Sequence, residues 1–197
     1  MLKPYSPVVV AGPSGAGKDA AIRRLTAKRT DIHDAVGYTT RPLREDETDG
    51  VDIAVTTRIH FEELIATGKL IEYDEKGGIY YGMPLSEVEN SKERLTIFNI
   101  AVSAARVIKA YDPNTITILI VPPTKEELRR RVGNRGEERY KRAKSEILEA
   151  LSFFDYVVIS ETGKQVEVAD NIEKIIEGQT EAFEIEKYAD FLKTFFD

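Results

Sequence analysis

Several features that mark other classes of protein are missing from this 197-residue sequence. It contains no cysteine, which excludes disulfide bonds and cysteine-ligated metal sites and fits a reducing compartment. No stretch approaches the roughly 20 apolar residues that a membrane helix needs. The apolar run near the N-terminus is too short for a signal peptide. We therefore expect a soluble, cytoplasmic protein with no membrane partner.

An excess of positive charge over the chain as a whole is also missing. Lysine and arginine number 28 against 34 aspartate and glutamate residues, which gives a formal net charge of −6. Such a chain is a poor counterion for nucleic acid, so we expect no nucleic-acid partner. Basic residues nevertheless gather at Arg41 and Arg44 and between Lys125 and Lys144. The length suits one domain with an inserted or mobile subdomain.

The most informative stretch is an apolar run, Val8–Val10, that leads through a glycine-rich loop into a helical pattern at about 18–29. The loop fits G-x-x-x-x-G-K, and strand, loop and helix in this order are the context of a phosphate-binding loop. Its backbone N–H groups would point at one anion, and Lys18 adds a full positive charge. A plain tight turn is the competing interpretation. The predicted nucleotide-binding residues are Gly12, Ser14, Gly15, Ala16, Gly17, Lys18 and Asp19.

Asp19 departs from the usual motif, in which a serine or threonine follows the lysine and binds Mg²⁺. A carboxylate is a hard ligand, and one or two carboxylates commonly hold Mg²⁺ beside substrate phosphates. Asp19 is therefore a candidate metal ligand, directly or through water. The alternative is that it only stabilises the first turn of the helix through the helix dipole.

Two groups of arginines are candidates for binding anions. Arg41 and Arg44 flank a proline that fixes the backbone, which is typical of a phosphate clamp, although either arginine alone would indicate an exposed basic turn. A second group surrounds the glycines at 133 and 136 and fits a lid that closes on a transferring group. The alternative there is a solvated helix surface. The candidate lid residues are Arg131, Arg135 and Arg139.

The remaining pattern alternates strands with helices. Buried strands are predicted at 95–100, 116–121 and 156–159, and helices at 102–110, 125–132 and 166–176. This alternation predicts an α/β fold with a parallel sheet and helices on both faces. Residues 37–89 interrupt it with a short strand at 51–55, a helix at 57–69, a hairpin about Gly77-Gly78 and a short helix at 84–92. We predict that these residues form a separate acceptor-binding lobe. In the first helix of this lobe, the side chains predicted to point inward, toward the lobe's own core, are Ile59, Phe61, Leu64 and Ile65.

Together these motifs resemble the guanylate kinase family from about Val8 to Gly178. The resemblance rests on Gly-Pro-Ser-Gly-Ala-Gly-Lys at 12–18, Thr-Thr-Arg-Pro-Leu-Arg at 39–44, Asp-Gly-Val-Asp at 49–52, Phe-Glu-Glu-Leu at 61–64, Leu-Ile-Glu-Tyr at 70–73, Tyr-Tyr-Gly at 80–82, Val-Pro-Pro at 121–123 and Asn-Arg-Gly at 134–136. It implies a P-loop kinase within residues 1–178. The implied parts are a core at 1–36 and 93–178, an acceptor-binding lobe at about 37–92 and a short lid at about 133–142.

The resemblance also implies a reaction, the transfer of the terminal phosphoryl group of ATP, with Mg²⁺, to the phosphate of GMP or dGMP. By position, Arg41, Arg44 and Tyr81 match residues that hold the acceptor phosphate. Glu72 matches the carboxylate that binds guanine, and an ionised carboxylate only accepts hydrogen bonds while the guanine edge offers two donors. The implied catalytic residues are Lys18, Arg41, Arg131, Arg135 and Arg139.

Five positions depart from the family pattern, namely Gly37, Ile53, Met83, Asn99 and Ala101. The pair Ile53-Ala54 and Asn99, together with Gly-Lys-Asp at 17–19, resemble features of ribose 1,5-bisphosphate phosphokinases, which phosphorylate a sugar phosphate. Glu72 and the arginine pair favour the nucleotide acceptor, with the sugar phosphate as the alternative. A catalytically silent binding domain is a third hypothesis, and the intact loop with Lys18 argues against it.

The end of the chain, 179–197, runs past the usual family end and is rich in aromatic residues. Its spacing is roughly amphipathic, which predicts a helical extension packed on the protein's own core. A homodimer contact is the alternative, because exposed aromatics would promote association.

Overall fold

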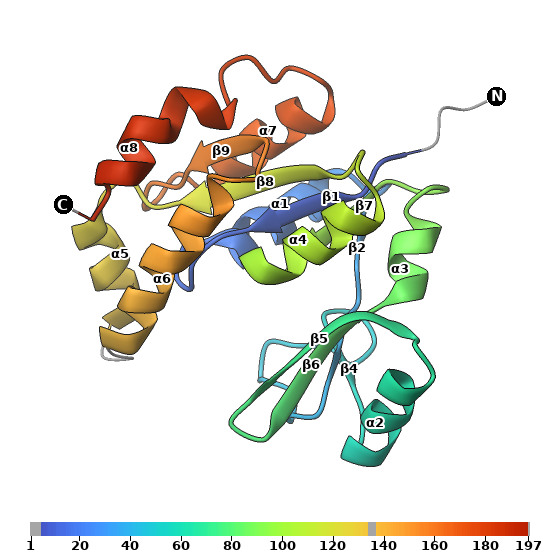
Figure 1. Cartoon of the computed structure of the whole chain (residues 1–197). Coiled ribbons are helices and arrows are strands. Elements are labelled where there is room, and N and C mark those ends of the chain that lie inside the picture. Colours follow the sequence, from blue (N-terminus) through green and yellow to red (C-terminus); the bar gives the residue numbers. More distant parts are fainter. Residues whose placement is uncertain (1–4, 134–136, 197) are drawn as a thin grey trace.

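The computed structural model describes residues 5–133 and 137–196, and a five-stranded parallel sheet lies at its centre (Figure 1). The strand order is β2-β7-β1-β8-β9. The strands are β1 (Val8–Ala11), β2 (His33–Asp34), β7 (Thr96–Asn99), β8 (Ile116–Val121) and β9 (Tyr156–Ile159). All pairs are parallel, which confirms the predicted α/β class, although the short strand β2 was not predicted.

The central strand β1 shows how both faces of this sheet become buried. Successive side chains of a strand point to opposite faces. Val8 and Val10 pack in one apolar cluster with helices α1 (Lys18–Lys28) and α7 (Gln165–Ile176). Val9 and Ala11 pack in the other with α4 (Val102–Tyr111) and α6 (Glu137–Ala150). Because both faces are covered, β1 is fully buried and needs no polar residue.

A second sheet forms the inserted lobe, seen below the central sheet in Figure 1. Its order is β4-β3-β6-β5, and the hairpin predicted about Gly77-Gly78 joins β5 to β6. Helix α2 (Arg58–Ala66) packs on it, and α3 (Leu85–Asn90) leads back to β7. The strands are β3 (Tyr38–Thr39), β4 (Ala54–Val55), β5 (Leu70–Lys76) and β6 (Ile79–Pro84).

Two predictions for this lobe are wrong in detail. The strand expected at 51–55 is reduced to Ala54–Val55, because the preceding residues form a turn closed by a hydrogen bond from the Thr48 amide to the Asp52 carboxylate. Ile59, predicted to point inward, has 73% of its surface exposed. It lies two residues, or roughly 200°, around the helix from Phe61, whereas Phe61 and Leu64 are buried as predicted.

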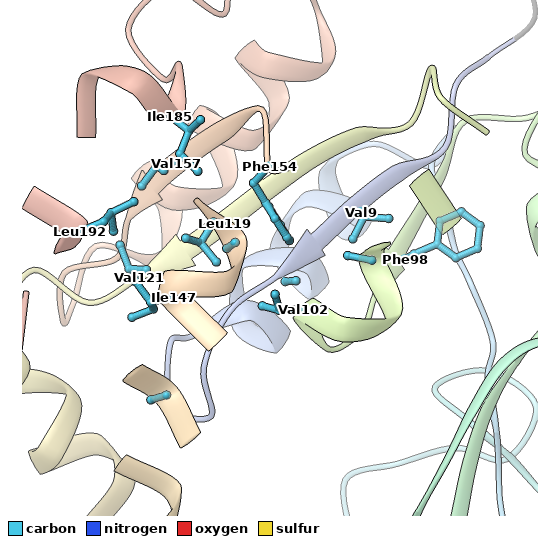
Figure 2. Close-up of a cluster of buried hydrophobic side chains, with 14 of the residues drawn as sticks. Val9, Phe98, Val102, Leu119, Val121, Ile147, Phe154, Val157, Ile185 and Leu192 are labelled. Atoms are coloured by element: carbon cyan, nitrogen blue, oxygen red, sulfur yellow. The ribbon is translucent and has the colours of Figure 1, made fainter. Parts of the chain in front are cut away.

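The C-terminal extension packs on the central sheet, as predicted. It consists of a 3₁₀ turn, η2 (Ile185–Tyr188), and helix α8 (Ala189–Thr194) rather than one continuous helix. Figure 2 shows Ile185 and Leu192 in the same cluster as Val121 and Val157 of the sheet. These side chains are covered within one chain, which favours packing on the protein's own core over the homodimer alternative. Across residues 5–133 and 137–196, no helix combines the length and apolar character needed to cross a membrane.

Candidate active site

The glycine-rich loop lies where β1 ends and α1 begins, and its glycines are required by geometry. Gly12 has φ 147°, and a Cβ added there would lie 2.1 Å from the Ile120 carbonyl oxygen of the neighbouring strand. Gly17 has φ 95° and caps α1, with Ser160 only 3.0 Å from an added Cβ. A side chain at Gly12 would collide with the backbone of β8, and the positive φ of Gly17 is one that residues with a Cβ rarely adopt. The loop is therefore held against β8 and β9 in a wrapped shape suited to an anion.

Lys18 opens helix α1 beneath this loop. Its ammonium donates to the carbonyl oxygens of Gly12 at 2.7 Å and Pro13 at 3.4 Å. Burial lowers the pKa of Lys18, while the carboxylates of Asp19 and Glu146 act in the opposite direction. Glu146 belongs to α6, the helix whose Arg139 also reaches the loop at Ser14. The lysine thus sits at the loop with hydrogen bonds that a phosphate oxygen could replace.

Two of the predicted lid arginines reach the same loop. Arg131, on α5 (Lys125–Val132), donates to the carbonyl oxygens of Ala16 at 3.3 Å and Ser160 at 2.6 Å. Arg139, on α6, donates to the hydroxyl of Ser14 at 3.4 Å. Arg135, the third predicted lid arginine, lies outside the described residues. Arginines from two helices therefore converge on the loop.

Arg131 is held in place by a residue that the sequence pattern did not single out. Glu127, one helical turn earlier, accepts from Arg131 at 2.8 Å and also from Arg130 at 2.7 Å. These arginines, with Thr162, lower the pKa of Glu127 well below its ordinary value. The (i, i+4) spacing was visible in the sequence, but it also fits any solvated helix surface. The side chain of Arg130 itself is exposed on that helix surface.

Asp19 points from the first turn of α1 toward the end of β7. One carboxylate oxygen accepts a hydrogen bond from the amide of Asn99 at 2.8 Å. Its other oxygen has no partner among residues 5–133 and 137–196, and that part of the chain holds no group of three or more metal-binding side chains. The site therefore fits Mg²⁺ shared between one carboxylate and bound phosphates, and it does not fit an all-protein metal cage.

In the inserted lobe, one face of the second sheet carries the predicted acceptor residues. Residues directly opposite in an antiparallel pair project from the same face. Glu72 is opposite Met83, and Tyr81 is opposite both Asp74 and Thr39, so Glu72, Tyr81 and Met83 share a face. Met83 is buried in the cluster that contains Phe98 of β7. The shared face therefore looks toward the central sheet, while Tyr80 on the other face stacks on Phe61 of α2.

Glu72 is a half-buried carboxylate with no hydrogen-bonding partner in the described part of the chain. Burial raises its pKa to about 7, Asp74 adds to the rise, and Lys76 opposes it. An unpaired, partly desolvated carboxylate destabilises a fold and is typical of a binding site. Its environment fits the ligand-binding role implied by the sequence.

Arg41 is paired with a residue that the sequence gave no reason to choose. Its guanidinium donates two hydrogen bonds of 2.6 Å to the carboxylate of Glu47, and both side chains are about nine-tenths buried. Glu47 raises the pKa of Arg41, with a smaller contribution from Tyr81, while Arg41 lowers the pKa of Glu47 to about 2. The Nε atom of Arg41 is buried without a partner among the described residues. The Nε–H of Arg41 is thus a donor that has no acceptor in the described part of the chain.

Arg44 is the more exposed member of the pair. Its side chain is 65% exposed and lies 3.5 Å from Glu47, and its backbone amide donates to the same carboxylate at 2.9 Å. Glu47 therefore ties the two predicted clamp arginines into one turn. An exposed guanidinium beside a fixed one can rotate toward a bound phosphate.

We expect the Glu47→Ala variant to be less stable than the wild type by about 1–3 kcal/mol, because it leaves the Arg41 guanidinium buried without its partner. Urea unfolding would measure the difference. Glu45→Ala removes an exposed carboxylate from the same turn and serves as the control. Equal stability of the two variants would show that the Arg41–Glu47 pair does not hold the turn.

Comparison with known proteins decides the family. The guanylate kinase family model matches residues 5–185. This chain belongs to the guanylate kinase family. It is 34% identical over 180 residues to a guanylate kinase from Oceanobacillus iheyensis, covering 87% of this chain and 86% of that one. It is 36% identical over 163 residues to one from Nostoc sp., covering 78% and 81%.

A solved structure supports the same assignment. The guanylate kinase from Anaplasma phagocytophilum matches with a TM-score of 0.71 and 27% identity, over 91% of this chain and 88% of that chain. The protein is therefore a phosphotransferase of this family with a P-loop kinase fold, and the hypothesis of a silent binding domain loses its support.

Within this guanylate kinase fold, two of the unusual positions prove to be neighbours. A Cβ added at Gly37 would lie 3.1 Å from the Gly82 carbonyl oxygen and 3.6 Å from the Met83 side chain. A serine at position 37 would therefore be tight against the Gly82 carbonyl oxygen and would touch the end of the Met83 side chain. The glycine and the methionine are compatible with each other, and together they make this part of the acceptor face apolar.

Proposed function

We propose that this guanylate kinase family member phosphorylates GMP or dGMP with ATP and Mg²⁺, at a site between the glycine-rich loop and the inserted lobe. The observation that carries the proposal is the unpaired Glu72 carboxylate on the lobe face that looks toward the central sheet. Tyr81 shares that face with Glu72, and it is near enough to Arg41 to help raise the pKa of that guanidinium. A base edge with two donors and a phosphate at one end match this arrangement.

In the proposed mechanism the protein aligns two phosphates and stabilises charge, so no covalent phosphoenzyme is formed. Lys18 and the loop amides bind the terminal phosphates of ATP. Arg41, Arg44 and Tyr81 hold the acceptor phosphate, and Glu72 holds the base. Arg131 of α5 would act on the transferring group from beside the loop, and Arg135 and Arg139 belong to a lid at about 133–142 that would close over this group and exclude water. Mg²⁺ bound with ATP would neutralise charge on the phosphate oxygens.

Acceptor choice tests this proposal. We expect phosphorylation of GMP or dGMP to exceed that of AMP, UMP and CMP, because only guanine offers Glu72 both donors. Ribose 1,5-bisphosphate belongs in the same panel, measured with a coupled assay for ADP release. Activity with ribose 1,5-bisphosphate alone would overturn the nucleotide assignment and establish the sugar-phosphate alternative. A protein that binds no ATP would overturn both.

A further inference from the structure

Two unusual residues of this chain, Asp19 and Asn99, meet although they lie 80 positions apart in the sequence. Asn99 is the last residue of β7, and the parallel register sets it beside Val10 of β1. The glycine-rich loop begins directly after β1, and Asp19 follows Lys18 on the first turn of α1. Strand order thus brings the end of β7 next to the start of α1, and the two side chains touch at 2.8 Å.

The chemistry of this contact is directional. A carboxylate only accepts hydrogen bonds, so the Asn99 atom that faces Asp19 is its amide nitrogen, Nδ2. A carboxylate at position 99 could not donate and would repel Asp19. The surroundings already include the half-buried Asp34, whose pKa is raised by burial and further by Asp52 and Asp19, while Arg23 opposes the rise. A neutral donor at position 99 therefore suits a carboxylate at position 19.

The contact also fixes which part of Asp19 is free. With Oδ1 occupied by Asn99, Oδ2 has no partner in the described part of the chain. We propose that Asn99 is a positioning residue, which orients Asp19 so that its free oxygen binds the Mg²⁺ of bound MgATP. The inference rests on the proposed function, since it assumes that ATP binds at the loop with Mg²⁺.

The test uses the full chain and measures ATP affinity by isothermal titration calorimetry, with excess Mg²⁺ and with EDTA. The ratio of the two affinities is the gain due to the metal. Residues that orient a metal ligand typically contribute 10–100-fold to metal affinity, so Asn99→Ala should reduce this gain by about tenfold. Asp19→Ala should reduce it at least as much. Asn114→Ala, at an exposed asparagine far from the loop, should leave it unchanged.

The double variant separates positioning from an independent role. If Asn99 acts only through Asp19, adding Asn99→Ala to Asp19→Ala should cause no further loss of the gain. Equal losses in the two backgrounds, or an unchanged gain in Asn99→Ala, would overturn the inference. Affinity in EDTA shows that each variant still folds and binds ATP. A wild-type protein that gains no affinity from Mg²⁺ would instead overturn the metal part of the proposed function.

Discussion

The Lys18→Met variant is expected to lose about 10²–10³-fold in turnover number with saturating ATP and GMP. Methionine keeps the apolar stem of the side chain but removes the ammonium that sits at the loop at 2.7 Å from the Gly12 carbonyl oxygen. In a partly dry site, one preorganised donor to a charged transition state contributes about that factor. Steady-state rates of GDP formation would measure the effect.

A control variant shows whether the effect comes from losing the charge at the loop or from losing any lysine of the protein. Lys193→Met removes an exposed lysine from α8 and should keep normal turnover. Circular dichroism melting should show that both variants fold. Near-normal turnover in the folded Lys18→Met variant would refute the loop mechanism, because no other lysine donates to the loop carbonyls in the described residues.

The parts of the site that local sequence could predict are those built by consecutive residues. The strand, loop and first helix follow from an apolar run, glycines at fixed spacing and a lysine, and the hairpin follows from Gly77-Gly78 between two strand patterns. In each case the physical cause, a glycine conformation or an alternation of side chains, is local. Patterns of this kind are therefore legible without knowledge of the fold.

The parts that could not be predicted depend on which elements become neighbours. Asp19 and Asn99 meet only because β7 lies beside β1 in the sheet, and strand order is not encoded in either segment. The Arg41–Glu47 pair is close in sequence, but Glu47 stands in an acidic turn where several carboxylates compete for the same partner. Ile59 fitted a helical stripe, yet α2 is only nine residues long and buries a narrow face.

Glu72→Gln is expected to lower the preference for GMP over AMP by about 100-fold, because an amide cannot accept both guanine donors without presenting its own N–H to one of them. The ratio of kcat/KM for the two acceptors is the measurement. Glu75→Gln changes an exposed glutamate of the same strand and should keep the wild-type preference. Equal preference in all three proteins would show that Glu72 does not bind the base.

The same variant should also change how the affinity for GMP depends on pH. Burial raises the pKa of Glu72 to about 7, so below that pH the free protein holds a protonated carboxyl that cannot accept both donors. The affinity of the wild type for GMP should therefore fall about tenfold per unit as the pH drops below 7. Glu72→Gln should lack this dependence. Titration of the GMP phosphate affects both proteins equally and cancels in the comparison.

The stability of the protein as a function of pH tests independently whether burial raises the pKa of Glu72. The folded pKa of Glu72 lies above its unfolded value, so the ionised group destabilises the fold, and the loss develops as the pH rises from about 4.5 to about 7. Glu72→Gln should therefore melt at a higher temperature than the wild type near pH 8 and at the same temperature near pH 4. A variant that loses guanine preference yet gains stability only at high pH identifies Glu72 as a desolvated carboxylate kept for binding. Equal melting temperatures at both pH values would refute the desolvation, and with it the reason for the pH dependence of GMP binding.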